Sequence, residues 1–92
     1  MSLKAPMSPY YVYILLCSDD SFYTGITNNL KQRFQDHQKG IGGAYTRSHK
    51  PIKIIYTEIV PDKSSALKRE AQIKKWSRKQ KLHFLVGLER TK

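Results

Sequence analysis

Cysteine is almost absent from this sequence, since Cys17 is the single one among 92 residues. One thiol excludes an intrachain disulfide, and with three scattered histidines it does not supply the ligand set of a structural zinc site. Cys17 follows Leu16 at the end of an apolar run, so we interpret it as a small buried hydrophobic residue. A chain without disulfides suits a reducing compartment, and we expect a cytoplasmic protein.

Acidic residues and long apolar runs are also scarce. The 7 Asp and Glu stand against 17 Lys and Arg, which gives a formal net charge of +10. This excess indicates a polyanionic partner, either nucleic acid or an anionic membrane surface. No apolar run approaches the roughly 20 residues of a membrane span, and residues 1–9 lack the apolar core of a secretory signal. We therefore expect nucleic acid, and no membrane, as the partner.

The length and the balance of residues predict one globular domain. Hydrophobic residues make up 39% of the chain and charged residues 26%, and no internal repeat is visible. We assign the domain to residues 10–88, a flexible N-terminal extension to residues 1–9 and a C-terminal tail to residues 89–92. A monomer or weak oligomer is expected.

The opening of the domain reads as a β-hairpin. Residues 10–17 and 22–27 are aromatic and β-branched, and the Ser and Asp residues at 18–21 favour a turn. The hairpin gathers four tyrosines in a small area: Tyr10, Tyr11, Tyr13 and Tyr23. A two-residue turn at 19–20 would place Tyr13 and Tyr23 on opposite faces of the sheet. A site shared by both rings requires an odd-length loop or a bulge, which we predict.

The remaining elements alternate between helix and strand. Asn28 and Asn29 are suitable caps for the first helix, and Ser77 with Gln80 forms a capping box for the last. Trp76 is expected to fill the corner between the last two helices. The predicted elements are a helix over Leu30–Lys39, a flexible loop over Gly40–Thr46, a central strand over Ile52–Ile59, a helix over Lys63–Trp76 and a helix over Arg78–Leu88 with Leu82, Leu85 and Val86 as its apolar stripe. The fold class is α+β, with a three-stranded antiparallel sheet flanked by helices.

Glu70 is in conflict with its surroundings in the sequence. It lies at helical spacing from Ala66 and Ile73, so a carboxylate falls in the middle of the face that packs on the sheet. Charged side chains are rarely buried unless they are paired or bind a cation. Two interpretations remain open, a salt bridge to Lys74 or a metal ligand.

Basic residues offer further candidates. Arg33 and His37 lie one helical turn apart, either as solvated cover for the core edge or as a phosphate clamp with an acid/base partner. The loop Gly40–Thr46 lacks the Gly-Lys-Ser/Thr ending of a P-loop, so nucleotide binding is not expected. It either approaches a phosphate backbone or is a mobile connector. From Lys63 onward ten Lys and Arg accompany two acids, which favours a polyanion-binding surface over a solvated face.

The segments Tyr11-Val12-Tyr13 and Tyr23-Thr24-Gly25 resemble the paired signature of the GIY-YIG nuclease domain. The tyrosines match, and so does Gly25, which we expect to make the turn. The chain departs where Tyr11-Val12 replaces Gly-Ile and where Thr24 replaces Ile. The resemblance extends over residues 10–88 in the order hairpin, arginine helix, third strand, glutamate helix. It is strongest to the small stand-alone bacterial proteins of this superfamily.

This resemblance implies a site and a cofactor. It implies a Glu on the helix after the third strand as ligand of a divalent metal, which places Mg²⁺ or Mn²⁺ at Glu70. Many members carry a late Asn near the site, whereas this chain has no Asn after Asn29. The implied catalytic residues are Tyr13, Tyr23, Arg33, His37 and Glu70. The candidates for binding nucleic acid are Tyr11, Thr46, Arg47, Lys50, Lys74, Lys75 and Arg78.

The leading hypothesis is a metal-dependent endonuclease that hydrolyses phosphodiester bonds in DNA rather than RNA, in branched, damaged or single-stranded form. The alternative is a non-catalytic nucleic-acid-binding module with the same fold, in which the tyrosines stack on bases or pack. A third hypothesis is a small interaction domain of a larger nucleic-acid machine.

Overall fold

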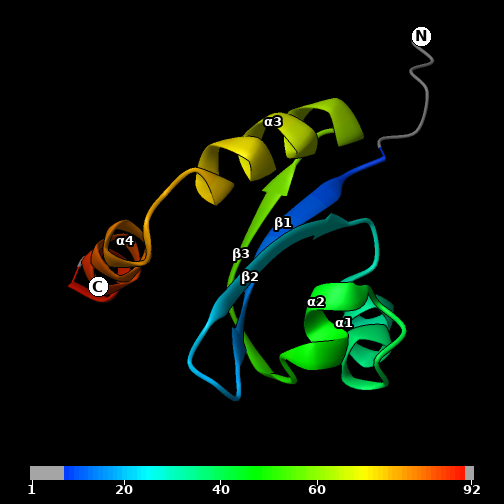
Figure 1. Cartoon of the computed structure of the whole chain (residues 1–92). Helices are drawn as coiled ribbons and strands as arrows, with labels where there is room; N and C mark the ends of the chain where they lie inside the picture. Colours follow the sequence, from blue (N-terminus) through cyan, green and yellow to red (C-terminus); the bar gives the residue numbers. More distant parts are fainter. Residues whose placement is uncertain (1–7, 91–92) are drawn as a thin grey trace, which may run out of the picture.

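The computed structural model describes residues 8–90, with side chains up to residue 87. Most of the extension predicted at residues 1–9 therefore lies outside the described residues. Three strands and four helices confirm the α+β class with a three-stranded antiparallel sheet (Figure 1). In chain order they are β1 (Tyr10–Cys17), β2 (Phe22–Thr27), α1 (Leu30–Gln38), α2 (Ala44–Ser48), β3 (Pro51–Val60), α3 (Lys63–Lys74) and α4 (Arg78–Arg90).

The order of the strands is β2-β1-β3, so β1 is the central strand. The prediction that the third strand is central was wrong, because β3 lies at an edge. The physical reason is burial, since residues 12–15 of β1 are 0–2% exposed on both faces of the sheet, whereas β3 exposes several of its side chains. A strand whose two faces are both apolar gains most from the central position.

The hairpin loop has the predicted odd length. Tyr13 pairs with Gly25 and Leu15 pairs with Tyr23, so the rings of Tyr13 and Tyr23 share one face. Asp20 takes a φ of 67°, the left-handed conformation that closes such a loop. The Asp19 carboxylate accepts a hydrogen bond from the Ser21 amide at 3.1 Å, as expected for a turn aspartate.

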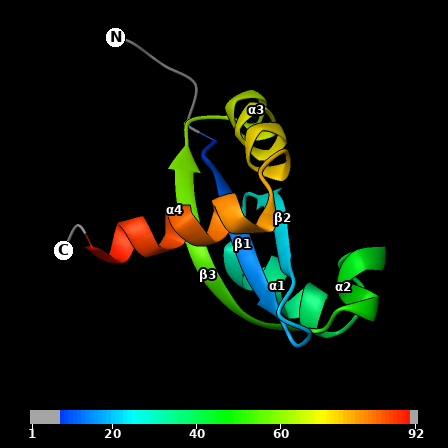
Figure 2. The ribbon, with the colours of Figure 1, turned by 60° about the vertical axis from the view of Figure 1, so that its left-hand side comes forward.

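The two faces of the sheet carry different helices (Figures 1 and 2). Helix α1 is capped by Asn29, whose side chain accepts from the Gln32 amide at 3.1 Å, and it covers the face of Tyr13. Helix α3 is capped by Asp62 and packs Ala66 and Ile73 on the opposite face, against Val12 and Ile14. These fully buried residues form the hydrophobic core.

The segment predicted as a flexible loop, Gly40–Thr46, overlaps the five-residue helix α2, so that part of the prediction was wrong. A helix of one turn and a half is not stable alone, and here Thr46 buries its side chain against α1. Tertiary packing therefore stabilises α2. The helix was not predicted because the glycines before it are typical of a flexible loop.

Helix α4 confirms its predicted capping box, with the Ser77 amide donating to Gln80 Oε1 at 2.8 Å and the Gln80 amide to Ser77 Oγ at 3.1 Å. The Trp76 ring lies 5.0 Å from that of Phe84, at the predicted corner. The apolar stripe was only partly right, since Leu82 and Val86 are 42% and 46% exposed. The helix crosses in front of the sheet, and its C-terminal end extends past the edge strand β3 (Figure 2). None of the helices over the described residues is long and apolar enough to cross a membrane.

Candidate active site

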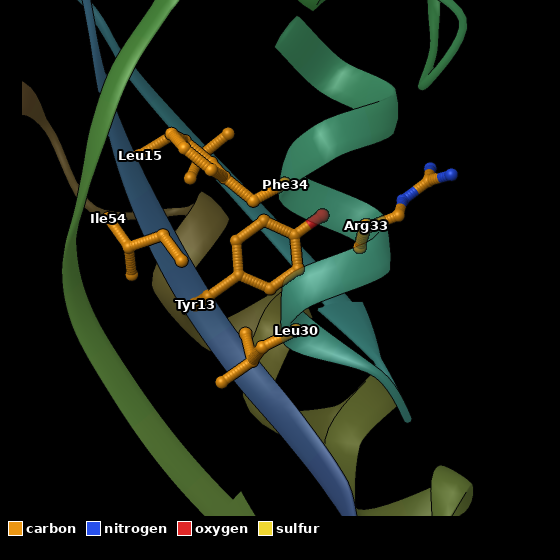
Figure 3. Close-up of a pocket in the computed structure, with 6 residues that line it drawn as sticks. All are labelled: Tyr13, Leu15, Leu30, Arg33, Phe34 and Ile54. Carbon is orange, nitrogen blue, oxygen red and sulfur yellow. The ribbon is translucent and has the colours of Figure 1, made fainter.

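Tyr13 is the centre of the site and is 2% exposed. Apolar side chains of β1, α1 and β3 pack around its ring and leave no room for a water molecule (Figure 3). Its hydroxyl passes over Gly25 of the neighbouring strand, where a Cβ atom would lie 2.5 Å from Tyr13 Oη. Gly25 lies inside β2 and does not make the expected turn. It serves instead as the place where the phenol crosses the backbone.

A buried chain of hydrogen bonds starts at the Tyr13 hydroxyl. Tyr13 Oη lies 2.8 Å from His37 Nε2, and His37 Nδ1 lies 2.7 Å from Thr46 Oγ1. His37 and Thr46 are 1% and 2% exposed. A Cβ on Gly42 would lie 2.5 Å from His37 Nδ1, so this glycine admits the imidazole. Three elements, β1, α1 and α2, thus hold one polar chain in the interior.

The two titratable side chains in this series of hydrogen bonds, His37 and Tyr13, are neutral at neutral pH. Burial lowers the pKa of His37 to about 4, and the cation of Arg33 acts in the same direction. Burial raises the pKa of the Tyr13 phenol to about 12, which Arg33 opposes and the charges of Tyr23 and Glu70 assist. A neutral imidazole has one N–H and one lone pair. If Nδ1–H donates to Thr46, the free lone pair of Nε2 accepts the phenol proton.

Tyr23 and Arg33 lie beside the hydrogen-bonded residues Tyr13, His37 and Thr46. The Tyr23 ring centroid lies 6.3 Å from that of Tyr13 and 5.1 Å from that of His37. Arg33 donates through one Nη2 hydrogen to the Gly42 carbonyl at 2.7 Å, which leaves other guanidinium hydrogens for an anion. The structure therefore brings together Tyr13, Tyr23, Arg33 and His37, from two strands and one helix.

Glu70 lies on α3, which packs on the other face of the sheet. Its side chain is 18% exposed and its carboxylate lies 3.2 Å from Lys74 Nζ. Its negative charge is the smallest of the contributions to the raised pKa of Tyr13, which burial dominates. The salt bridge to Lys74 is present, and it does not exclude a metal at the second carboxylate oxygen.

These side chains can bind a divalent metal in one way only, through a single carboxylate together with water and substrate. Among the described residues, no three His, Cys, Asp or Glu side chains are grouped as metal ligands. Mg²⁺ keeps several waters and is often bound by one or two carboxylates together with substrate phosphates. A single half-buried carboxylate such as Glu70 fits that mode of binding, and would hold the metal when substrate is present.

The sequence comparison agrees with this geometry, since residues 9–83 match the GIY-YIG catalytic domain. This chain belongs to the GIY-YIG family. It is 52% identical over 80 residues to a UPF0213 protein of Syntrophus aciditrophicus (strain SB), a match that covers 86% of this chain and 92% of the relative. A UPF0213 protein of Staphylococcus haemolyticus (strain JCSC1435) is 43% identical over 79 residues and is covered over 96% of its length.

Two solution NMR structures of similar proteins share the GIY-YIG fold described here. The protein EF2693 from E. faecalis has a TM-score of 0.60 and 39% identity, over 97% of this chain and 92% of that one. The UPF0213 protein BH0048 from Bacillus halodurans has a TM-score of 0.54 and 40% identity, over 87% and 84%. The GIY-YIG family is one of nucleases, which act on nucleic acid, and the UPF0213 name states no activity.

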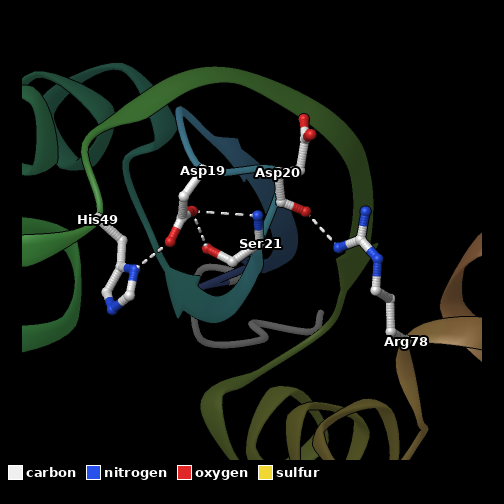
Figure 4. Close-up of polar contacts among 5 residues, drawn as sticks. All are labelled: Asp19, Asp20, Ser21, His49 and Arg78. Carbon is white, nitrogen blue, oxygen red and sulfur yellow. Dashed lines mark hydrogen bonds and ion pairs between the residues drawn. The ribbon is translucent and has the colours of Figure 1, made fainter.

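The residues predicted to bind nucleic acid differ in their exposure around the GIY-YIG centre: one is buried, one is half-buried and the others are exposed. Thr46 was expected to contact a phosphate, but it is buried and bonded to His37, so we reassign it to the interior. Arg78 donates to the Asp20 carbonyl and lies 4.7 Å above the Phe22 ring, so it fastens α4 to the hairpin (Figure 4). Tyr11 is half-buried on β1. The exposed cations among the candidates are Arg47, Lys50, Lys74, Lys75 and Arg78 itself.

Sequence reasoning missed the part that α2 plays in this GIY-YIG site. Tyr45 stacks on Tyr23 at 5.6 Å and on His49 at 4.1 Å. His49 Nδ1 in turn lies 2.6 Å from Asp19 Oδ2 of the hairpin loop (Figure 4). The available signal was the pair Gly42-Gly43, one residue before a Tyr-Thr dipeptide, because such glycines permit close approach of a backbone.

Proposed function

We propose that this GIY-YIG protein is a metal-dependent endonuclease that hydrolyses phosphodiester bonds in DNA. The observation that carries the proposal is the buried chain Tyr13–His37–Thr46 beside Arg33. Core positions rarely hold such a polar chain unless every member has a partner or a task. The net charge of +10 supports a polyanionic substrate, and we place the protein in the cytoplasm as a monomer or weak oligomer.

Arg33 binds the phosphate in this proposal. One of its N–H groups is fixed by the Gly42 carbonyl, so the orientation of the planar guanidinium is set before substrate arrives. The remaining donors hold two oxygens of the phosphodiester and neutralise charge that increases as the pentavalent state forms.

Tyr13 and His37 move the proton of the attacking water. The neutral phenol cannot act as a preformed phenolate, because its pKa is about 12. Because Tyr13 is 2% exposed, this role requires that substrate binding admits the attacking water to Oη. The water proton then passes to Tyr13 Oη while the Tyr13 proton passes to His37 Nε2. The water oxygen then attacks phosphorus, and the bond to the leaving oxygen breaks. A bound phosphodiester adds negative charge beside His37, which favours its protonated form and strengthens it as acceptor.

Glu70 and Tyr23 complete the proposed site. Glu70 would hold Mg²⁺ or Mn²⁺, which supplies neutralisation of charge on the leaving oxygen. Tyr23 packs at the edge of His37 and limits the orientation of its ring. Branched, damaged and single-stranded DNA are the proposed substrates, because a domain of 92 residues has little surface for reading bases.

A second function, non-catalytic binding of nucleic acid, is favoured by one observation. Lys74 already neutralises Glu70 at 3.2 Å, so the carboxylate can be structural alone. In that case the basic surface would bind DNA with strong salt dependence and no cleavage.

Cleavage of labelled oligonucleotides distinguishes the two functions. Single-stranded and branched DNA are incubated with the wild type, with Glu70→Gln and with Lys68→Ala, an exposed control on the same helix. We expect products with Mg²⁺ from the wild type and from Lys68→Ala, and none in EDTA or from Glu70→Gln. Equal products in EDTA would refute the metal role, and bound but uncut DNA with every divalent metal would favour the binding module.

A further inference from the structure

A polar hollow opens beside the proposed centre, at the end of β2 where the chain turns toward α1. Its volume is about 330 Å³, which is at the lower end of ligand-binding pockets at roughly 300–1,000 Å³. Its lining residues are Tyr10, Ile26, Thr27, Asn28, Arg33 and Lys63. Arg33 is thus shared between the hollow and the hydrogen-bonded centre.

The charge of this lining has one sign. Arg33 and Lys63 contribute cations, and among residues 8–87 no acidic side chain lines the hollow. The acidic residue nearest to Lys63 in the sequence is Asp62. Its carboxylate accepts a hydrogen bond from the Ser65 amide at 2.8 Å as the N-cap of α3. The hollow therefore suits an anion such as a phosphate group, with one cation supplied by α1 and one by α3.

The apolar part of the lining suits a sugar or a base. Tyr10 is half-buried and packs with Ile26 against the core cluster, so its ring has a fixed position. Thr27 bonds the Asn29 amide at 3.0 Å and is already satisfied, whereas Asn28 is exposed. A fixed aromatic ring next to an exposed amide is the combination that stacks on a base and bonds its edge.

We infer that this hollow binds the nucleotide adjacent to the cleaved bond, with its phosphate between Arg33 and Lys63 and its sugar or base against Tyr10. The inference rests on the proposed nuclease function and extends it. The strand would then cross the centre and leave toward the exposed cations Arg47 and Lys50. Tyr10 and Lys63 are binding residues in this proposal, and they do not touch the reacting atoms.

Binding measurements in EDTA test the hollow without any cleavage. Fluorescence anisotropy with a labelled single-stranded oligonucleotide is measured at several salt concentrations. We expect Lys63→Ala to lower the slope of log affinity against log salt by about 1, while Lys68→Ala on the same helix leaves the slope unchanged. Equal slopes for Lys63→Ala and Lys68→Ala would overturn the inference.

A second pair of variants tests the ring. Tyr10→Phe keeps the aromatic face, whereas Tyr10→Leu keeps only apolar packing against the core. We expect unchanged affinity for Tyr10→Phe and a loss of about tenfold for Tyr10→Leu, in line with base stacking, with thermal unfolding as the check on folding. Equal affinity of the two folded variants would contradict the role of Tyr10.

The two proposals can fail separately. If the wild type cleaves DNA and the Lys63 and Tyr10 variants bind like it, the hollow is refuted and the nuclease stands. If the variants weaken binding as expected and no metal supports cleavage, the hollow is a nucleic-acid site on a non-catalytic module.

Discussion

Gly25→Ala is the substitution for which the structure gives the clearest magnitude. The added Cβ would lie 2.5 Å from Tyr13 Oη, 2.7 Å from Tyr13 Cζ and 3.0 Å from Tyr23 Cε2. Ordinary contacts of this kind are 3.4–4 Å, so the phenol must move by about 1 Å, a displacement that can cost roughly 100-fold in rate. The hydrogen bond of 2.8 Å to His37 would lengthen with it.

We therefore expect Gly25→Ala to fold, with an unfolding free energy lower by about 1–3 kcal/mol, as is typical of overpacking. Its cleavage rate should fall by about 100-fold. Single-turnover cleavage of labelled DNA and denaturant unfolding measure the two effects separately. Gly87→Ala is the matched control, because a Cβ there has no atom within 4 Å. It should gain up to about 1 kcal/mol from helix propensity and cleave like the wild type.

A folded Gly25→Ala protein with wild-type cleavage would refute the reasoning, because the position of the Tyr13 phenol would then not matter. The denaturant curve shows whether Gly25→Ala is folded. A variant that is inactive because it is unfolded can therefore be recognised and set aside. A Gly87→Ala protein with the same loss of rate would show that the assay responds to any glycine replacement.

Three further predictions concern the residues around the Tyr13 phenol. Thr46→Val removes the acceptor for His37 Nδ1–H and should slow cleavage by about 10- to 100-fold, comparable to the loss of a buried hydrogen bond, while Thr46→Ser should restore it; equal rates for Val and Ser would show that the hydroxyl is not used. His37 has a folded pKa of about 4, lowered from 6.5, so its stabilising contribution is complete above pH 6.5 and is lost as the pH falls toward 4, by up to about 3 kcal/mol. The unfolding free energy of the wild type minus that of His37→Gln, measured over this range, should show that fall, and a flat difference would contradict it. In Arg33→Lys, a single ammonium group cannot bind the Gly42 carbonyl and a phosphate as the planar guanidinium does. We expect its cleavage rate at saturating substrate to fall at least about tenfold. A wild-type rate would show that Arg33 takes no part in the reaction.

The local elements of this fold were predictable from the sequence because their signals are local. The bounds of the hairpin, at Tyr10–Cys17 and Phe22–Thr27, follow from β-branched and aromatic runs on either side of Ser and Asp residues. The Ser77–Gln80 capping box has a fixed spacing. Even the odd loop followed from requiring one face for two tyrosines.

Long-range features were not predictable in the same way. Strand order depends on which strand is buried on both faces. The signal for it is the apolar run of β1 against Lys53 and Glu58 in β3, and it is visible only when two distant segments are compared. Helix α2 exists through the contact of Thr46 with His37, for which sequence propensity gives no signal. Gly25 was interpreted as a turn residue because glycine permits both a turn and a close approach.

The candidate site shows the same division. Their spacing placed Arg33 and His37 on one helix face, and the resemblance implied their catalytic roles; the structure places both beside Tyr13. The role of Thr46 was misassigned because a Thr after a glycine-rich loop is expected at the surface. The two interpretations of Glu70 stay compatible, since its bond to Lys74 leaves one oxygen available.

The central claim is that Glu70 on one face of the sheet and Tyr13 on the other act on the same phosphodiester. Single-turnover cleavage by Tyr13→Phe, Glu70→Gln and the double variant tests it directly. Groups that act as one unit are strongly non-additive, so we predict that the double variant is about as slow as the slower single variant. Full multiplication of the two losses, or wild-type cleavage by either single variant, would contradict the account.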